Sequence, residues 1–479
     1  MKAKRIILLM LLPLIFWGGC ATYYKKTRKF QSYVTSGEIE KARELIDRDE
    51  KLKNGKNKLL YHMNRGWVYW MLGDAETSNA EFETADLLIE DYHRQLGYEA
   101  LSLISNPGIK PYQAEDFEKV MVNYFKALNY LQLGNHEDAI VEARRIIIKL
   151  QQLNSKYKEK KNRYSDDAFA HIMIGLIYDA EGDYNNAFIA YRNALEVYES
   201  IYSENFGVEA PGQLRHDLLR TAYLTGFHDQ VEVYEKKFGI NYQHQEQKGG
   251  DVVVFWQNGF GPVKSEWGIT FVAVPGDAGF ITYTNEEYGL TFPFYIGDRP
   301  KEEQSQLRNL NIVRVAFPKY LERRPVYRQA LIKVNSREYS FELAQNMNNI
   351  AFKTLRDRML RELGNSLLRL ATKKAMEIAV REATAKSSKE NKLDAGDIAP
   401  AAITLINAFT EKADTRNWQT LPYSISYTRL HLPRGKHQAE LEVSNKNSIQ
   451  KHTIELDVAA GKTSFYVHQT LATTDPVQQ

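Results

Sequence analysis

Cysteine is nearly missing from this chain, which has one residue, Cys20, in 479. A single thiol excludes an internal disulfide, and it leaves no pair of thiolates for a structural zinc site. The fold must therefore be stabilised by packing. The length is sufficient for this, because such a chain can divide into roughly two to four domains that each bury a core.

The chain also lacks an excess of charge of one sign. It has 63 basic and 60 acidic residues, and the difference of three lies in Lys2, Lys4 and Arg5. The remainder is neutral, whereas a protein that follows a phosphate backbone normally has a basic face or a basic excess. We therefore expect no nucleic-acid partner.

The apolar run near the N-terminus is too short to span a bilayer. It extends from Ile6 to Trp17 and is interrupted by Pro13, whereas a spanning helix needs about 20 apolar residues. The order of features is typical of a bacterial lipoprotein signal: a charged start, this apolar run, Gly18-Gly19 and then Cys20. This predicts a signal peptide over 1–19, acylation of Cys20 by chains such as palmitate, and a tether over 20–29. Trp17 departs from the usual aliphatic residue, and ordinary cleavage after Ala21 is the alternative.

The residues after the cysteine, Ala21-Thr22-Tyr23-Tyr24, lack an aspartate. In sequences that resemble enterobacterial lipoproteins, aspartate at this place retains the protein in the inner membrane. The pattern therefore predicts a location at the outer membrane, lipid-anchored, on the periplasmic face.

Signatures of catalysis are missing. There is no His-Glu-x-x-His pair and no Gly-x-Ser-x-Gly elbow, and the segment 461–463 (Gly-Lys-Thr) lacks the first glycine of a phosphate-binding loop, where Leu456 stands. His431, His437, His452 and His468 fall on neighbouring expected strands, but nothing fixes a third metal ligand there. We expect no enzymatic activity, no cofactor and no metal; a carboxylate pair hidden in a cleft is the open alternative.

Residues 30–240 have apolar side chains three and four apart, which predicts helices. The segment 168–199 resembles a tetratricopeptide repeat. Its small and aromatic positions are Gly175, Tyr178, Ala187, Tyr191 and Ala194. Two earlier units show the same pattern, with Gly66, Tyr69, Phe82 and Ala85 in one and Ala127, Tyr130, Ala139 and Ala143 in the other.

Small residues let the two helices of a hairpin approach, and aromatic residues fill the gap to the next hairpin. The turn glycines 37, 73, 134, 182 and 226 are unevenly spaced, so we expect an irregular array. Its concave groove would hold a protein partner, and a purely structural array is the alternative. The run 156–163 is either a basic docking patch or a solvated loop.

Composition changes at residues 241–250, where we place a linker. Residues 251–345 and 420–470 show strand signals and predict a β-sandwich. Residues 346–412 return to a helical period and predict an inserted helical hairpin, packed on the sheet or lying on a membrane. A tail follows at 471–479. The fold class is thus α+β, with an N-terminal all-α helical-repeat array before a β-sandwich-like domain.

Two aromatic and polar stretches are candidate binding segments. Their key residues are Trp256, Asp414, Arg416 and Trp418. Exposed, they could bind a glycan or a protein; buried, the tryptophans would be core anchors and Asp414 with Arg416 an ion pair at a corner.

The chain resembles a group of uncharacterised Gram-negative lipoproteins that have helical repeats before a strand-rich region. The resemblance lies in the segments 255–264, 317–320, 414–422 and 432–435. The resemblance implies an envelope lipoprotein and supplies no catalytic residue. We expect a non-enzymatic, lipid-anchored scaffold that binds a periplasmic or outer-membrane protein, in envelope assembly or in regulation of a cell-wall synthase. The alternative is a glycan or peptidoglycan binder that uses the aromatic β-domain.

Overall fold

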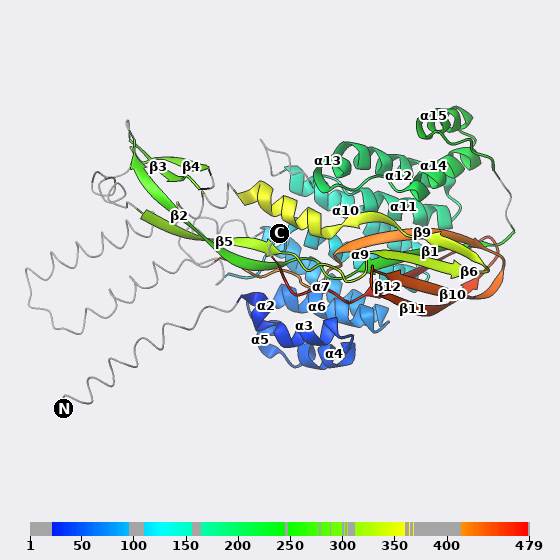
Figure 1. Ribbon diagram of the computed structural model, residues 1–479, viewed down its shortest axis with the longest axis horizontal. Helices are drawn as coiled ribbons and strands as arrows, with labels where there is room; N and C mark the ends of the chain where they lie inside the picture. The colour runs from blue at the N-terminus through cyan, green and yellow to red at the C-terminus, as the bar shows by residue number, and fades with distance from the viewer. Residues whose placement is uncertain are drawn as a thin grey trace, which may run out of the picture.

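The structure, a computed structural model, describes most of the chain (Figure 1). It covers residues 22–94, 110–155, 164–244, 248–276, 279–287, 289–298, 312–359 and 413–477, with residues 301, 304, 364 and 367. Cys20, the signal segment, the run 156–163 and most of the expected hairpin over 346–412 lie outside the described residues.

The N-terminal half is helical. Its helices are α2 (Tyr23–Lys26), α3 (Arg28–Thr35), α4 (Ile39–Asp47), α5 (Glu50–Asn54), α6 (Lys58–Met71), α7 (Ala75–Arg94), α9 (Asp116–Gln132), α10 (His136–Ser155), α11 (Ala168–Ala180), α12 (Tyr184–Val197), the π-helix η3 (Tyr198–Tyr202), α13 (Ser203–Phe206), α14 (Gly212–Thr225) and α15 (His228–Phe238). None of the described helices is long and apolar enough to cross a membrane.

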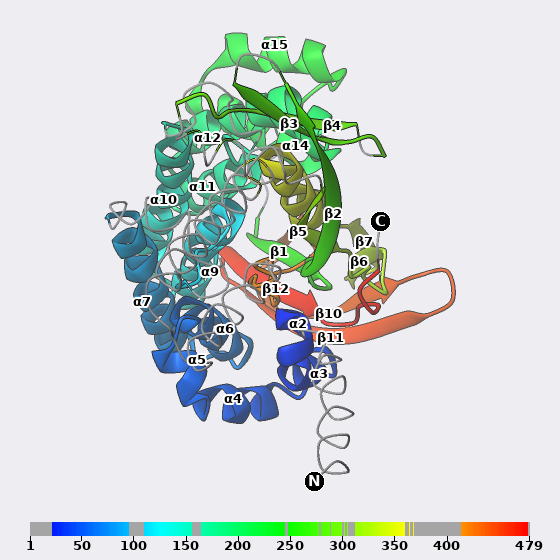
Figure 2. The same ribbon diagram turned by 90° about the vertical axis from the view of Figure 1, so that its left-hand side faces the viewer.

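Consecutive helices pair as antiparallel hairpins: α6 with α7, α9 with α10, α11 with α12, and α14 with α15. The turns between them contain glycines at positive φ, as at Gly134 (72°) and Gly182 (77°), a conformation that costs other residues free energy. The next helix then begins at a capping side chain: the Asp183 carboxylate accepts the backbone N–H of Asn186 at 3.1 Å. The expected helical-repeat array is thus confirmed. Figure 2 shows it as an arc that curves around the strands.

Within the described residues, the strands form three four-stranded sheets. They are β1 (Gly250–Asn258), β2 (Val263–Pro275), β3 (Phe280–Asn285), β4 (Leu290–Tyr295), β5 (Ile312–Leu321), β6 (Gln329–Val334), β7 (Arg337–Ser340), β8 (Glu342–Asn346), β9 (Ser424–Leu432), β10 (Gly435–Ser444), β11 (Ile449–Val458) and β12 (Thr463–Thr470). The inner sheet has the order β12-β1-β9-β8, the outer sheet β11-β10-β6-β7 and the projecting sheet β4-β3-β2-β5.

The inner and outer sheets form the expected sandwich. Alternate residues of β1 point to opposite faces: Val252, Val254 and Trp256 pack against the outer sheet, while Val253 and Phe255 join the helical core. The inner sheet is therefore buried on both faces. The α+β class is confirmed, as three layers of helices, inner sheet and outer sheet.

The projecting sheet is the main departure from a single sandwich. Strand β2 pairs with β5 from Val263 to Val272 and, at its far end, with β3 from Val272 to Pro275. The sheet extends away from the sandwich, to the left in Figure 1. The sequence predicts strands at these positions, and the structure has them. It does not predict which strands pair, because pairing depends on contacts between residues far apart in the chain.

The tether expected over 20–29 is folded where it is described. Helix α2 begins at Tyr23, whose side chain is buried, and its backbone N–H donates to Thr415 Oγ1 at 3.0 Å. The Thr27 hydroxyl donates to Gln419 Oε1 at 3.0 Å. Residues 22–29 are thus held by hydrogen bonds to the segment that precedes β9, with the Tyr23 side chain buried. Of the expected insert, residues 347–359 are helical.

Candidate functional site

Two helical glycines lie directly beneath aromatic rings. A Cβ on Gly175 would lie 2.4 Å from the ring of Tyr191, and one on Gly66 would lie 2.8 Å from the ring of Phe82. Because glycine has no side chain, the two helices of each hairpin can approach closely enough for the ring of one to pack on the backbone of the other. Other small residues singled out from the repeat pattern are also fully buried: Ala85, Ala127, Ala139, Ala187 and Ala194.

The tyrosines at the remaining repeat positions, Tyr69, Tyr130 and Tyr178, are half-buried. The Tyr69 hydroxyl donates to Asp47 Oδ2 on α4 at 3.3 Å. The guanidinium of Arg144 on α10 contacts the Tyr178 hydroxyl on α11 and lies 5.2 Å from the ring centroid. Tyr69 and Tyr178 thus link one hairpin to the preceding one.

The concave side of the array is filled by the chain's own inner sheet. The ring of Phe255 on β1 meets the ring of Phe169 on α11 edge to face, with centroids 5.8 Å apart. Gln257 Nε2 donates to the Tyr124 hydroxyl on α9 at 2.9 Å. Both residues are fully buried. The groove that was expected to hold a protein partner is occupied by β1.

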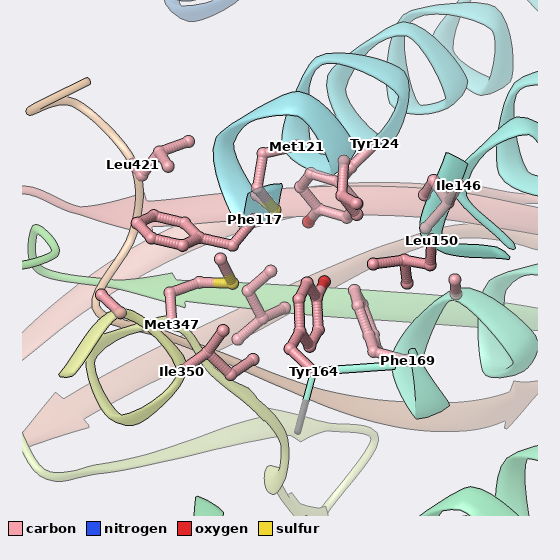
Figure 3. Packing of buried hydrophobic residues seen from close by; sticks show 14 of the residues in the cluster. Phe117, Met121, Tyr124, Ile146, Leu150, Tyr164, Phe169, Met347, Ile350 and Leu421 are labelled. Atoms are coloured by element: carbon pink, nitrogen blue, oxygen red, sulfur yellow. The ribbon is translucent and has the colours of Figure 1, made fainter. Parts of the chain in front are cut away.

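Strand β8 and the helix after it continue this contact. The Tyr198 hydroxyl donates to Ala344 O at 2.7 Å, and Gln345 Nε2 donates to Asp167 Oδ2 at 2.9 Å. Figure 3 shows Met347 and Ile350 among the side chains of α9, α10 and α11. The helices and the sheet therefore share one core.

Trp418 is inserted between the helices, and its side chain is 1% exposed. Its ring centroid lies 5.8 Å from that of Phe82 and 5.7 Å from that of Phe125. Its indole N–H donates to Thr420 Oγ1 at 2.8 Å, and its backbone N–H donates to Glu118 Oε1 at 2.7 Å. The residue occupies the place of a core anchor and offers no surface to a ligand.

Beneath Trp418 lie two buried glutamates. Burial, followed by the nearby charge of Glu115, raises the pKa of Glu118 to about 7. Burial would also raise the pKa of Glu115, but Arg358, at 2.6 Å, and Lys264 hold it well below its ordinary value. The two carboxyls therefore titrate far apart. Such a pair can act in acid–base catalysis, but Glu118 already accepts backbone N–H groups of Glu115 and Trp418, which is a structural role.

Asp414 and Arg416 form an ion pair at the corner before β9. Arg416 Nε donates to Asp414 Oδ1 at 2.8 Å, and Arg416 Nη1 donates to Lys110 O at 2.9 Å. The arginine is 6% exposed. Arg416 joins this corner to the loop before α9. Its hydrogen bonds are made to other residues of the chain, which is a structural role.

A buried charge cluster joins β9 to the array. Arg429 Nη1 donates to Asp179 Oδ2 at 2.6 Å and to Asp217 Oδ1 at 2.7 Å, while its Nε donates to Asp251 Oδ2 at 3.0 Å. Burial opposes ionisation, but Arg429 and Arg220 lower the pKa of Asp179 to about 2. A cavity of ≈ 450 Å³ opens beside the cluster, between α14 and the strands. Sequence reasoning missed these residues, because single charged residues spread over 250 positions give no local pattern.

The histidines of the strand-rich half do not converge on one point. His431 Nδ1 lies 2.7 Å from Asp251 Oδ1, and His437 Nε2 lies 2.7 Å from Pro433 O. His452 and His468 have ring centroids 4.5 Å apart. No three His, Cys, Asp or Glu side chains of the described residues are placed to hold a metal ion.

Trp256 is 4% exposed and lies between the two sheets of the sandwich. A cleft of ≈ 690 Å³ opens at that end of the sandwich. Aromatic side chains of its lining include Tyr327, Phe341 and Tyr423, with Arg328 exposed at its rim. This is the place in the described β-domain where aromatic and polar groups face a common hollow.

Comparison with known proteins identifies one repeat. Residues 170–201 match the tetratricopeptide repeat family. No curated protein sequence matches the chain. Among solved structures, the chain is similar to MamA of AMB-1 at 15% identity, over 44% of this chain and 87% of that one, with a TM-score of 0.28.

Two further similarities are of the same kind. The apo form of RapI is 15% identical over 48% of this chain and 56% of its own, with a TM-score of 0.33. A Podosopora anserina putative kinesin light chain with nearly identical TPR-like repeats is 11% identical over 44% of this chain and 92% of its own, with a TM-score of 0.30. The match over 170–201 falls on α11, α12 and the start of η3 and identifies this hairpin as a tetratricopeptide repeat. The neighbouring helices pair in the same way, so the N-terminal region is tetratricopeptide-like, an architecture of protein-interaction scaffolds.

Proposed function

We propose that the protein is a lipid-anchored, non-enzymatic scaffold on the periplasmic face of the outer membrane, and that it binds a protein partner in envelope assembly or cell-wall synthase regulation. The observation that supports it most is the tetratricopeptide-like array closed around the inner sheet. Because β1 fills the concave side, the partner binds the outer side. The lipid signal at Cys20 supports the location.

The outer side has apolar residues available for a partner. Figure 2 shows α7 and α10 on the outside of the arc. On α10, Val141 is 46% exposed and Ile148 is 50% exposed; seven residues apart, they share one helix face. Leu87 on α7 and Ile189 on α12 are exposed as well. Interfaces are commonly centred on such side chains, surrounded by polar groups.

A photo-crosslinking residue in place of Ile148 tests this in the full-length protein in a Gram-negative host. We expect a defined crosslinked partner, identified by mass spectrometry, that is lost in a Val141→Glu variant. The matched control is Ile449, which is 63% exposed on β11 and should give no such product. The same products from both positions, or none at Ile148, would refute an outer-side partner.

The anchor is tested by comparing wild type with Cys20→Ala. We expect acyl mass on the wild type and flotation with outer membranes, and neither for the variant. If both proteins are free of acyl groups and stay in solution, the lipid-anchored scaffold must be abandoned.

The cleft favours one alternative, a glycan or peptidoglycan binder. Aromatic faces bind sugar rings by stacking and dispersion, and Tyr327, Phe341 and Tyr423 line the hollow. If purified cell wall sediments the wild type but not Tyr327→Ala, the alternative gains support. Tyr295→Ala on the projecting sheet is the control. Trp256 is unsuitable for this test, because its truncation would disturb the core of the sandwich.

A further inference from the structure

The two faces of the projecting sheet differ in burial. On one face, Ile269 and Phe271 of β2 and Ile281 and Tyr283 of β3 are buried. The opposite face exposes large apolar side chains from three strands. Their exposed fractions are 51% for Val272, 48% for Val274, 42% for Phe280 and 54% for Tyr295.

Strand register brings these side chains into one patch. Val274 is the partner of Thr282, which is in turn the partner of Pro293. Phe280 is the partner of Tyr295, and their ring centroids lie 5.1 Å apart. Directly paired residues point to the same face of a sheet. We call Val272, Val274, Phe280, Thr282, Pro293 and Tyr295 the outer patch.

The patch contains no acidic residue, and an arginine flanks it. Arg314 on β5 is exposed and pairs with Thr270, two residues before Val272 on the same face. Contiguous apolar surface of this kind marks a site of interaction with a protein or a membrane. Val, Phe, Tyr and Thr with a flanking cation are suited to the boundary between acyl chains and headgroups, where aromatic side chains are enriched. Glu286 and Glu287 on the β3–β4 turn are exposed. Because charged carboxylates stay in water, we expect the sheet to lie at the membrane surface without entering the acyl-chain region.

The position of α2 favours a membrane over a protein as the occupant. Helix α2 contacts β2 and begins at Tyr23, three residues after Cys20. Three residues span at most roughly 10 Å, so acyl chains on Cys20 would enter the bilayer close to α2. Strand β2 has 13 residues and is about 43 Å long at 3.3 Å per residue. In Figure 1 α2 is at the left-hand end of the helical array, and the projecting sheet extends to the same side.

We infer that the outer patch docks on the membrane that holds the lipid anchor, as a second attachment point at the far end of β2. The inference rests on the proposed anchor at Cys20. One flexible attachment leaves a protein free to rotate, whereas two points separated along β2 fix its orientation. The outer side of the repeat array is then presented to the periplasm at a defined angle.

The test uses the fact that Cys20 is the chain's one cysteine. Since acylation consumes that thiol, Thr282→Cys provides a unique site for a polarity-sensitive fluorophore in the full-length lipidated protein. Asn447→Cys, on the exposed β10–β11 turn of the sandwich, is the matched control. Both proteins are reconstituted in vesicles of phosphatidylethanolamine and phosphatidylglycerol with a headgroup-level nitroxide quencher.

We expect a blue shift and several-fold stronger quenching at position 282 than at 447. The shift should disappear in Val274→Glu, while this variant still floats with the vesicles through its lipid. A label at 282 that is as accessible to water as the label at 447, in protein that floats, would overturn the docking and leave the anchor intact.

If intact mass shows no acyl group, the anchor proposal fails by itself. The patch is then tested in a chain that starts at Thr22 behind a histidine tag, bound to nickel-chelating lipid at the same place. The same comparison of positions 282 and 447 decides the question: a shift at 282 supports docking, and equal exposure of both labels overturns it.

Discussion

Arg429 on β9 and Asp179 on α11 form a buried ion pair, with Nη1 and Oδ2 2.6 Å apart across 250 residues of sequence. The arginine side chain is 6% exposed and the aspartate side chain 2%. The pair lies where the inner sheet meets the array, and Asp217 completes it. Charged groups this deeply buried require their partners, so the two halves of the chain are specified for each other.

Replacing Arg429 should therefore destabilise the whole molecule. In Arg429→Met, Asp179 and Asp217 would share the one remaining guanidinium of Arg220. Removing one member of a buried charge cluster costs about 3–5 kcal/mol, because the other charges stay desolvated. The free energy of unfolding in urea, followed by circular dichroism, measures the loss.

The control for this prediction is Arg48→Met. Arg48 pairs with Glu44 on α4, and the two side chains are 80% and 56% exposed, so water screens the interaction. We expect no measurable change there. Equal stability of the Arg429 variant and the wild type would show that the array does not depend on the inner sheet.

Glu118 should make stability depend on pH near neutrality. Its pKa in the folded state is about 7, raised by burial and by Glu115, so the folded protein retains a proton that the unfolded chain has lost. Stability from this group is full below the unfolded pKa of about 4.5 and is lost as pH rises to about 7. The decline should be on the order of 2–3 kcal/mol. Urea unfolding at a series of pH values from 5 to 8 measures it.

The Glu118→Gln variant removes the titration and should flatten this decline, whatever its effect on absolute stability. Glu286→Gln, on the exposed β3–β4 turn, should retain the wild-type profile. A slope that persists unchanged in Glu118→Gln would assign the pH dependence to another group.

Local pattern was sufficient for the elements themselves. The glycines at positions 134 and 182 end helices at positive φ, and the strand signal that begins at residue 251 coincides with β1. These features depend on neighbours within a few residues. A sequence displays such neighbours directly.

The relation between the halves was not predictable in this way. Nothing near Gln257 indicates that its amide meets the Tyr124 hydroxyl, and nothing near Trp418 indicates that it lies between Phe82 and Phe125. An apolar helix face predicts that the face is buried, but it does not indicate whether another part of the chain or a partner protein covers it. The inner face of the array was therefore assigned to a partner when the chain itself fills it.

Gly175→Ala should disturb the hairpin of α11 and α12. Its Cβ would lie 2.4 Å from the Tyr191 ring, and overpacking of a close contact typically costs about 1–3 kcal/mol. Gly261→Ala is a matched control in a buried place, since its Cβ would lie 3.5 Å from its nearest neighbour, the backbone oxygen of Leu421. We expect a lower urea midpoint for Gly175→Ala alone. Equal midpoints would mean that Tyr191 moves aside freely.

Trp418→Ala should separate a core role from a binding role. The ring is fully buried against two phenylalanines, so truncation leaves a cavity that costs about 3–5 kcal/mol. Trp418→Phe keeps an aromatic ring and loses the bond to Thr420, at a cost nearer 1 kcal/mol. Thermal unfolding and sedimentation with cell wall are measured together. We expect Trp418→Ala to lose more stability than Trp418→Phe. The folded fraction of each variant should sediment with cell wall to the same extent as the wild type. A stable Trp418→Ala protein with reduced sedimentation would instead place Trp418 at a ligand.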